Sequence, residues 1–343
     1  MNIGLTYDLR DEYRRQGYNE EETAEFDELA TVVGIESALR SLGHTTKRVG
    51  HLGALAARLV QGDRWDLVFN LAEGLHGYGR EAQVPALLEA YRIPYTLSDP
   101  LVLSLALHKG AAKRYLRDHG ICTPDFEIVE SLQDLERVAL PYPLFVKPIA
   151  EGSSKGISAA SKVRDRAQLR AACEHLLDRY LQPVLVERFL PGREFTVGIL
   201  GSGREAQALG AMEVLLRAQA ESEVYSYANK KDYERRVQYR LAEDEAGVAA
   251  MRMALDVWTA LGGRDAGRID LRCDEAGRVQ FIEANPLAGL HPKHSDLVIL
   301  GRMKGLTYAA LIERIVSSAA RRVPAQSGAQ SGARRAPMNA MMP

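Results

Sequence analysis

The chain has 343 residues, which is enough for two or three domains of ordinary size. Hydrophobic residues make up 46% of it and charged residues 26%, as in soluble globular proteins, and no stretch approaches the roughly 18 apolar residues of a membrane helix. Lys and Arg number 44 against 45 Asp and Glu, so the overall charge gives no support to a nucleic-acid or anionic-membrane partner.

The first third of the chain alternates between predicted strands and helices. Strands are predicted at residues 2–7, 44–50 and 66–73, and helices at 25–44, 54–63 and 80–94. Alternation of this kind is typical of an open α/β domain with a parallel sheet, which we expect at 1–105. Charged residues occur within the first ten positions, so we expect no signal peptide and a cytoplasmic protein.

Two further units and a tail are predicted after residue 105. Residues 106–185 form a small α+β unit, with helices at 107–120, 131–138 and 164–181 and strands at 125–129, 143–149 and 184–190. Residues 186–323 carry antiparallel strands at 193–200, 208–216, 234–240, 267–274 and 278–284, and helices at 243–262 and 307–322. Residues 324–343 are rich in Gly, Ser, Pro, Ala and Gln, and we expect them to be disordered.

Common nucleotide-binding and metal-binding patterns are absent from the sequence. The turn after residue 7 lacks G-x-G-x-x-G, and the chain has no G-x-x-x-x-G-K-[ST], so neither a dinucleotide fingerprint nor a P-loop is present. Cys122, Cys173 and Cys273 are far apart and show no metal-site spacing, so we expect reduced thiols.

The segment GRIDLRCDEAGRVQFIEANP (267–286) places oxygen-bearing side chains on neighbouring strands. Glu283 and Asn285 are two residues apart and share a face of their strand, and hairpin pairing brings Asp270 close to both. Arg268 shares the face of Asp270. Carboxylate and amide oxygens suit Mg²⁺, and a cation suits phosphate, so this face predicts a metal and phosphate site. A solvated face with a routine ion pair is the alternative interpretation.

A Gly/Ser-rich loop follows the apolar strand that ends near Lys147. The loop AEGSSKGIS (150–158) offers backbone N–H groups and the hydroxyls of Ser153 and Ser154, which together with Lys147 could bind phosphate. In VERFLPGREF (186–195), Glu187 and Glu194 could accept hydrogen bonds from adenine or ribose. For both segments an ordinary surface loop remains the alternative.

The order of these pieces resembles the ATP-grasp superfamily. Lys109, VKP, EGSSKG, VERFLPGREF, GRIDLR and FIEANP follow one another along the chain. Within that superfamily, residues 60 to 320 are similar to the D-alanine–D-alanine ligases, whereas the first 60 residues match poorly. The resemblance implies a three-domain ATP-grasp architecture with a parallel α/β unit, a small α+β unit and a C-terminal unit with an antiparallel sheet.

The resemblance also implies roles for individual residues. Lys109 and Lys147 would contact the ATP phosphates, and Lys230 would close over them from a mobile loop. The adenosine would be held by Glu187, the backbone through Leu190, and Glu194. Two Mg²⁺ ions, for which Mn²⁺ could substitute, would be bound by Asp270, Glu283 and Asn285. Ser153 and Ser154 would belong to the closing loop. Arg268 and the Gly289 N–H would stabilise an oxyanion. Glu28 would hold the first substrate's ammonium, and Ser295 would lie near the second substrate's carboxylate.

Three departures from the family pattern concern the substrates. A charged insertion, residues 8–22, stands between the first strand and helix. Lys231 occupies a position that is commonly tyrosine, and lysine cannot accept a hydrogen bond. The loop after the metal strand reads NPLAGLHPKHSDL, in which His291, Lys293 and His294 could line a different acceptor site or be a solvated loop.

The family's histidine in the first unit has no certain match. Glu73, His76 and Arg80 of LAEGLHGYGRE are all candidates, and we expect at least one of them to contact substrate because ligands bind at strand ends of α/β domains.

The hypothesis from sequence is therefore an ATP-dependent carboxylate–amine ligase that forms an amide through an acyl phosphate. D-Alanyl-D-alanine formation is the first substrate guess, and a relative with altered amino-acid substrates is the second. The alternatives are a non-catalytic ATP-binding protein and an ATP-grasp kinase. The expected partners are small-molecule amino-acid substrates, with no nucleic acid and no membrane, and the family pattern suggests a homodimer through the first unit.

Overall fold

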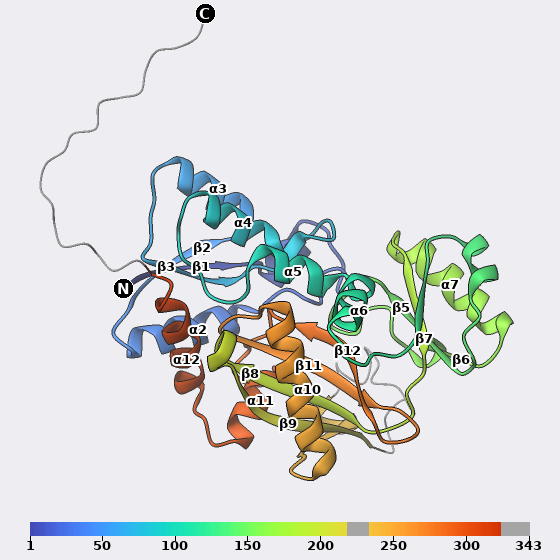
Figure 1. Cartoon of the computed structure of the whole chain (residues 1–343). Coiled ribbons are helices and arrows are strands. Elements are labelled where there is room, and N and C mark those ends of the chain that lie inside the picture. Colours follow the sequence, from blue (N-terminus) through green and yellow to red (C-terminus); the bar gives the residue numbers. More distant parts are fainter. Residues whose placement is uncertain (218–232, 324–343) are drawn as a thin grey trace, which may run out of the picture.

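The computed structural model describes residues 1–217 and 233–323, which form three sheets with their helices (Figure 1). The predicted mobile-loop residues Lys230 and Lys231 and the predicted disordered tail lie outside these residues. No helix within the described ranges combines the length and hydrophobicity needed to cross a bilayer. The three cysteines are free thiols, with Cys122 exposed.

The first sheet is parallel, as the alternating pattern predicts. Its strands run in the order β2-β1-β3, and all three pair in parallel. The strands are β1 (Asn2–Tyr7), β2 (Thr45–Gly50) and β3 (Leu67–Leu71), and the helices are α2 (Leu29–Ser41), α3 (Leu52–Val60), η1 (Arg80–Ala82) and α4 (Gln83–Ala90). Every residue of β3 is buried, which is expected for a parallel strand covered on both faces.

The last helix of the chain packs against this first unit. Helix α12 (Tyr308–Ala320) lies beside α2 in Figure 1, and Ile312 and Ile315 share one hydrophobic core with Ile35 and Leu39. The N-terminal and C-terminal units therefore share a core, which fixes the walls of any cleft between them.

The charged insertion is an ordered segment. It contains the short helix α1 (Arg10–Arg15), and the Arg10 guanidinium donates hydrogen bonds to the carbonyl oxygens of Thr23, Ala24 and Phe26 at 3.2–3.3 Å. The predicted helix at 25–44 begins only at Leu29, so the preceding residues, including Glu28, belong to the end of this insertion.

The central unit has an antiparallel sheet in the order β4-β7-β5-β6. Its strands are β4 (Phe126–Val129), β5 (Leu144–Pro148), β6 (Lys162–Val163) and β7 (Val184–Arg188), with helices η2 (Leu132–Arg137), η3 (Ala159–Ser161) and α7 (Arg166–Tyr180). Helices α5 (Pro100–Leu107) and α6 (Lys109–Asp118) lead into it. The boundary expected at 185/186 falls inside β7, so we propose that this unit extends through Arg188.

The C-terminal unit is an antiparallel sheet in the order β10-β9-β8-β11-β12. Its strands are β8 (Glu194–Leu200), β9 (Gln207–Leu216), β10 (Val237–Leu241), β11 (Ala266–Cys273) and β12 (Val279–Asn285), and its helices are η4 (Gly203–Glu205), α9 (Tyr233–Arg236), α10 (Glu245–Leu261) and α11 (Asp296–Met303). Trp258 of α10 is fully buried against the sheet, and Gly267 lies so close to its ring that an added Cβ would come within 2.4 Å. The fold is thus the mixture of α/β and α+β units that the sequence predicts.

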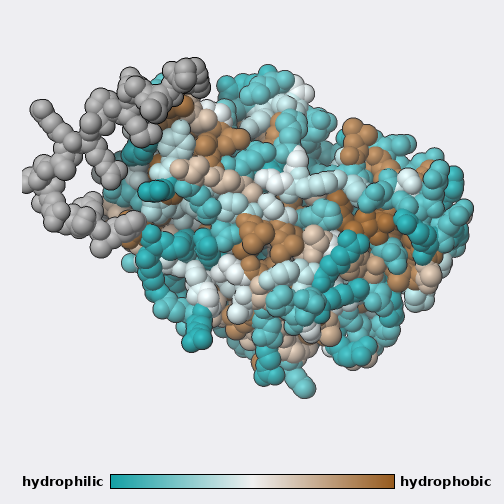
Figure 2. All heavy atoms as spheres, turned by 45° about the horizontal axis from the view of Figure 1, so that its top comes forward, coloured by the Kyte–Doolittle hydropathy of each residue, from teal (hydrophilic) through white to brown (hydrophobic). Residues whose placement is uncertain are grey.

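The face drawn in Figure 2 carries no single large apolar surface among its described residues. In the view of Figure 2 the surface is mostly hydrophilic, with separate hydrophobic patches. The most exposed large hydrophobic side chains are spread along the chain, as at Val60, Leu101 and Leu181. Scattered exposure of this kind is normal for a globular protein.

Candidate active site

A cleft of about 480 Å³ lies where the three units meet. Its walls come from the insertion, the turns after β3, the start of α6, the Gly/Ser loop, and the β11–β12 hairpin with the loop that follows it. Predicted site residues that line it are Glu28, Lys109, Ser153, Arg268, Glu283, Asn285, Gly289, His291 and Ser295. Pockets of this size at domain junctions are where small molecules usually bind.

The predicted metal ligands converge as the strand pairing requires. Asp270 of β11 is paired with Glu283 of β12, and the Asn285 amide donates a 3.1 Å hydrogen bond to Asp270 Oδ2. Burial raises the pKa of Asp270, and the nearby Glu283 carboxylate raises it further, against the opposing effect of Arg268. A divalent cation would offset this cost of burying two carboxylates, and the oxygen donors suit Mg²⁺, so the residues fit a metal site.

Arg268 is held by two acids. Its Nη2 lies 3.0 Å from Asp270 Oδ2, and its Nη1 lies 2.5 Å from Asp296 Oδ2. Asp296 is the first residue of α11 and was not singled out in the sequence, because one acid in a polar loop carries no distinguishing pattern. Gly289 borders the same corner, where an added Cβ would come within 3.0 Å of Ser295 Oγ.

The predicted phosphate lysines are both buried, in different surroundings. Lys109 Nζ lies 3.4 Å from Glu283 Oε2 and donates to the Glu151 carbonyl at 2.5 Å. Lys147 lies outside the cleft lining, with its Nζ 2.8 Å from Glu187 Oε1. Burial lowers the pKa of Lys147, but the Glu187 and Glu283 carboxylates outweigh that effect and raise it overall. Both lysines are therefore held beside carboxylates near the predicted metal ligands.

The predicted adenosine residues form a polar group that includes one lysine missed in the sequence. Lys113 of α6 is fully buried, and its Nζ lies 2.9 Å from the second oxygen of Glu187. Burial lowers the pKa of Lys113 to about 8 despite the opposing Glu187 carboxylate. Leu190 is buried in the following turn, and Glu194 pairs with Arg272 at 3.1 Å. In this structure each carboxylate oxygen of Glu187 thus pairs with a lysine.

The Gly/Ser loop is tied to the insertion. Gly152 donates its N–H to Glu25 Oε1 at 2.5 Å, and Glu25 Oε2 lies 2.8 Å from the Arg80 guanidinium. Ser153 and Ser154 have φ of 49° and 57°, a left-handed conformation that favours glycine, so the loop backbone is strained. Ser153 lines the cleft and Ser154 does not.

Two of the substrate candidates lie outside the lining of the cleft. Arg80 is buried, holds Glu25 and donates to the Ala150 carbonyl at 2.9 Å, so it fixes the loop and does not reach the cleft. His76 is exposed and does not line the cleft either. Glu73 is the one residue of the three candidates that does line it.

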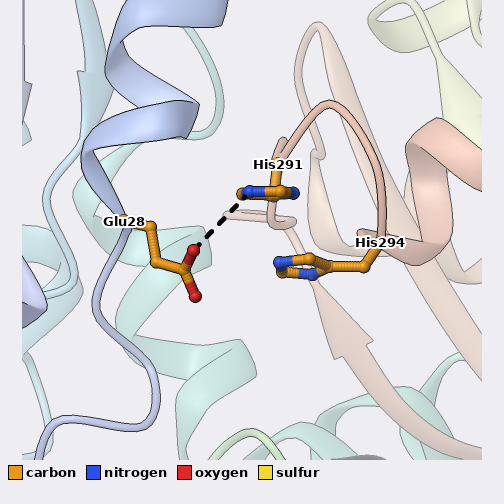
Figure 3. Close-up of side chains that lie close together, drawn as sticks. All are labelled: Glu28, His291 and His294. Carbon is orange, nitrogen blue, oxygen red and sulfur yellow. Dashed lines mark ion pairs between the residues drawn. The ribbon is translucent and has the colours of Figure 1, made fainter.

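Glu28 lies beside two stacked histidines from the loop after β12, as Figure 3 shows. The rings of His291 and His294 are 3.6 Å apart and nearly parallel, and His291 Nε2 is 3.7 Å from Glu28 Oε2. The Lys293 backbone N–H donates to His291 Nδ1, so the neutral ring carries its proton on Nε2. The ligand atoms of the three residues lie within 4.8 Å of one another, but a protonated Nε2 on His291 has no lone pair to offer a metal ion.

Three half-buried carboxyls on the wall of the first unit have raised pKa values. Burial raises the pKa of Asp27 and of Glu81 to about 7 each, and burial together with Glu81 raises that of Glu73 well above its usual range. The neighbouring cations pair with other acids, Arg10 with Glu28 and Arg80 with Glu25. The cleft is therefore acidic on this side.

Replacing Asp27 with asparagine is expected to weaken the pH dependence of stability. The folded protein keeps the Asp27 proton up to about pH 7, while the unfolded chain releases it near pH 4. The folded state binds more protons in that window, so its unfolding free energy falls as pH rises, by on the order of 3 kcal/mol from this group. Denaturant unfolding should show that the free energy of unfolding falls less between pH 5 and pH 8 in Asp27→Asn than in the wild type. The control Asp178→Asn, at an exposed position, should show the wild-type fall. Equal falls in the wild type and Asp27→Asn would contradict the assignment.

Comparisons with known proteins agree with this geometry. Residues 116–317 match the family model described as the D-ala D-ala ligase C-terminus. The chain is 33% identical to a D-alanine–D-alanine ligase of Bordetella avium, over 85% of this chain and 89% of that protein. It is 36% identical to an uncharacterized protein of Sinorhizobium fredii, over 75% of each. The crystal structure of a Bacillus anthracis D-alanine–D-alanine ligase complexed with ATP has the same fold, with a TM-score of 0.70 at 21% identity over 94% of this chain and 98% of that one.

Proposed function

The chain belongs to the family of D-alanine–D-alanine ligases and is an ATP-dependent ligase, and from that premise we propose that it activates an amino-acid carboxylate as an acyl phosphate and joins it to an amine. The observation that carries the proposal is the convergence of Asp270, Glu283 and Asn285 beside Arg268 and Lys109, of which all but Asp270 line one cleft. A carboxylate is a poor acyl donor, and phosphorylation supplies the leaving group that amide formation needs.

Different residues would bind the metal ions, the phosphates and the adenosine in that reaction. Asp270, Glu283 and Asn285 would hold two Mg²⁺ ions, which would supply charge neutralisation at the phosphates. Lys109 and Lys147 would orient the phosphates, with Lys230 closing from the segment that the structure does not describe. Adenine and ribose would be held near Glu187, Leu190 and Glu194. The Glu187 carboxylate would then contact the nucleotide as well as Lys113 and Lys147.

The other cleft residues would act on the two substrates. Glu28 would receive the donor's ammonium, because it lines the cleft at the N-cap of α2. Arg268 and the Gly289 N–H would stabilise the oxyanion that forms when the amine attacks. The loop with Ser153 and Ser154 would exclude water, which would otherwise hydrolyse the acyl phosphate.

Alanine is the first amino acid to test as donor. Relatives at 33–37% identity are named D-alanine–D-alanine ligases, and a structural relative with a TM-score of 0.70 is named a D-Ala:D-Ser ligase from Enterococcus faecalis. The insertion, Lys231 and the histidine-containing loop are the features that favour altered substrates. We further propose a cytoplasmic protein that forms a homodimer through the first unit, which the mass in solution would test.

The proposed function is tested by release of ADP and phosphate with Mg²⁺ and ATP. D- and L-amino acids and simple amines would be supplied singly and in pairs, with mass spectrometry of the products. A pair that raises turnover and yields its condensed mass supports the ligase and names its substrates. ATP turnover that accumulates a phosphorylated acid without any amide would contradict amide formation.

A further inference from the structure

The start of the Gly/Ser loop (150–158) contacts a buried ion pair of the first unit. Glu25 and Arg80 lie 2.8 Å apart, and both side chains are less than a tenth exposed. Glu25 accepts the Gly152 N–H at 2.5 Å, and Arg80 donates to the Ala150 carbonyl at 2.9 Å. Because the ion pair already fixes both side chains, this contact with the loop is rigid.

The end of the loop is linked to the charged insertion through Tyr180. Gly156 lies so close to the Tyr180 ring that an added Cβ would come within 2.9 Å of it. The Tyr180 hydroxyl donates a hydrogen bond to Glu21 of the insertion, and Arg179 lies 2.6 Å from the other oxygen of that carboxylate. Burial raises the pKa of Glu21, but Tyr180 and Arg179 outweigh that effect and lower it overall. Glu21 is therefore a charged acceptor at neutral pH.

The backbone between these two contacts is strained. Ser153 and Ser154 both have positive φ, and a strained backbone of this kind persists only where its surroundings hold it. The loop and the segment before α2 also line the same cleft, the loop with Gly152 and Ser153 and the segment with Glu20. The contacts that hold the loop therefore also close this side of the cleft.

The contacts at the two ends of the loop differ in how readily they can break. The Glu25–Arg80 pair is buried, whereas Arg179 is 49% exposed and Glu21 31% exposed. A half-exposed ion pair is weak, because water can replace its hydrogen bonds at little cost. The Glu21 contact is thus the one that can open and re-form while substrates enter and products leave.

We propose that Glu21, bonded to Tyr180 and Arg179, is a positioning residue that keeps the Gly/Ser loop closed over the cleft during the reaction. The inference rests on the proposed ligase function and gives a role to the insertion, which is a departure from the family pattern. An open loop would admit water. Water would attack the acyl phosphate in place of the amine, and the donor acid and phosphate would be released without an amide.

Breaking the Glu21 contact is expected to increase the ATP turnover that yields no amide. Glu21→Gln keeps the size of the side chain but removes its charge, and Tyr180→Phe removes only the hydroxyl. With the donor and an accepted amine present, ADP release should stay close to one per amide in the wild type. The rate of ADP release without amide should rise about two- to fivefold in each variant, the range that one half-exposed ion pair supplies.

Hydrogen exchange of residues 150–158 tests the same contact without any chemistry. In protein loaded with Mg²⁺ and a non-hydrolysable ATP analogue, these amides should exchange about two- to fivefold faster in Glu21→Gln and in Tyr180→Phe than in the wild type. Arg179→Gln combined with Glu21→Gln should add little to Glu21→Gln alone, because both substitutions break one contact.

Asp63→Asn is the matched control. Asp63 is 45% exposed, pairs with Arg58 at 3.3 Å and lies outside the cleft lining, so its loss should leave both measurements at their wild-type values. Thermal melting shows whether each variant folds, and Tyr180→Phe carries the test if Glu21→Gln does not.

Unaltered exchange of 150–158 in the folded variants would overturn the contact as a means of holding the loop. Faster exchange with an unaltered ratio of ADP to amide would overturn its role in excluding water. Failure of the ligase function itself looks different, since no amide would then form with any pair of substrates while the difference in exchange would remain.

Discussion

Replacing Glu283 with glutamine is expected to lower kcat by on the order of 10³-fold. The substitution keeps the size of the side chain but removes a charged oxygen ligand from the face that Asp270 and Asn285 share. Metal neutralisation of the transferred phosphoryl group contributes several kcal/mol, and each 1.4 kcal/mol is about tenfold in rate. ADP release measured against Mg²⁺ concentration checks the effect.

Binding of ATP without Mg²⁺ should change little in this variant, because the lysines near the phosphates remain. Glu174→Gln, an exposed position on α7, is the matched control and should retain full turnover. Near-normal turnover of Glu283→Gln would show that the metal site is assigned to the wrong residues.

Replacing Arg268 with lysine is expected to lower kcat by on the order of 10²- to 10³-fold. Lysine keeps a positive charge near Asp270 and Asp296, so neither acid is left without a cation and the variant should fold. A single ammonium group cannot reproduce the planar guanidinium, which bonds to two acids and still faces the oxyanion. One hydrogen-bond donor to an oxyanion contributes about 3–4 kcal/mol.

The step affected by Arg268→Lys distinguishes its role. The KM for ATP should change less than kcat, because the arginine acts on the acyl centre. Single-turnover measurements should show a slower amide-forming step after phosphorylation. A large rise in the KM for ATP with an unchanged kcat would place Arg268 at the nucleotide instead.

The sequence predicts the convergence of Asp270 and Glu283 because strand geometry is local. The alternation of polar and apolar residues in 267–284 fixes both the hairpin and the face that Asp270 and Glu283 share, and the structure pairs the two residues directly. The parallel sheet of the first unit follows in the same way from alternating strands and helices.

Among the helices that were missed, α5 and α11 have sequences without helical periodicity. Residues 100–107 (PLVLSLAL) are almost continuously apolar, and α11 combines an apolar stretch with a charged loop before it. A short apolar run does not distinguish a buried helix from a strand. Because α11 was not predicted, Asp296 was not recognised either, since its contact with Arg268 depends on the position of that helix.

The roles of Glu25 and Arg80 depend on contacts between segments far apart in the chain. Glu25 lies just after the charged insertion, at the start of the helix predicted for 25–44, yet it bonds to Gly152 and Arg80 at once. Such a contact follows from how the three units pack, and no spacing within either segment encodes it.

Transfer of ¹⁸O from the donor carboxylate to phosphate tests the central claim most directly. The donor amino acid would be labelled in both carboxyl oxygens and allowed to react with ATP and an accepted amine. If the acid is activated as an acyl phosphate and then captured by the amine, one labelled oxygen appears in inorganic phosphate for each amide formed. Phosphate that carries no label, or label that appears in AMP, would contradict the mechanism.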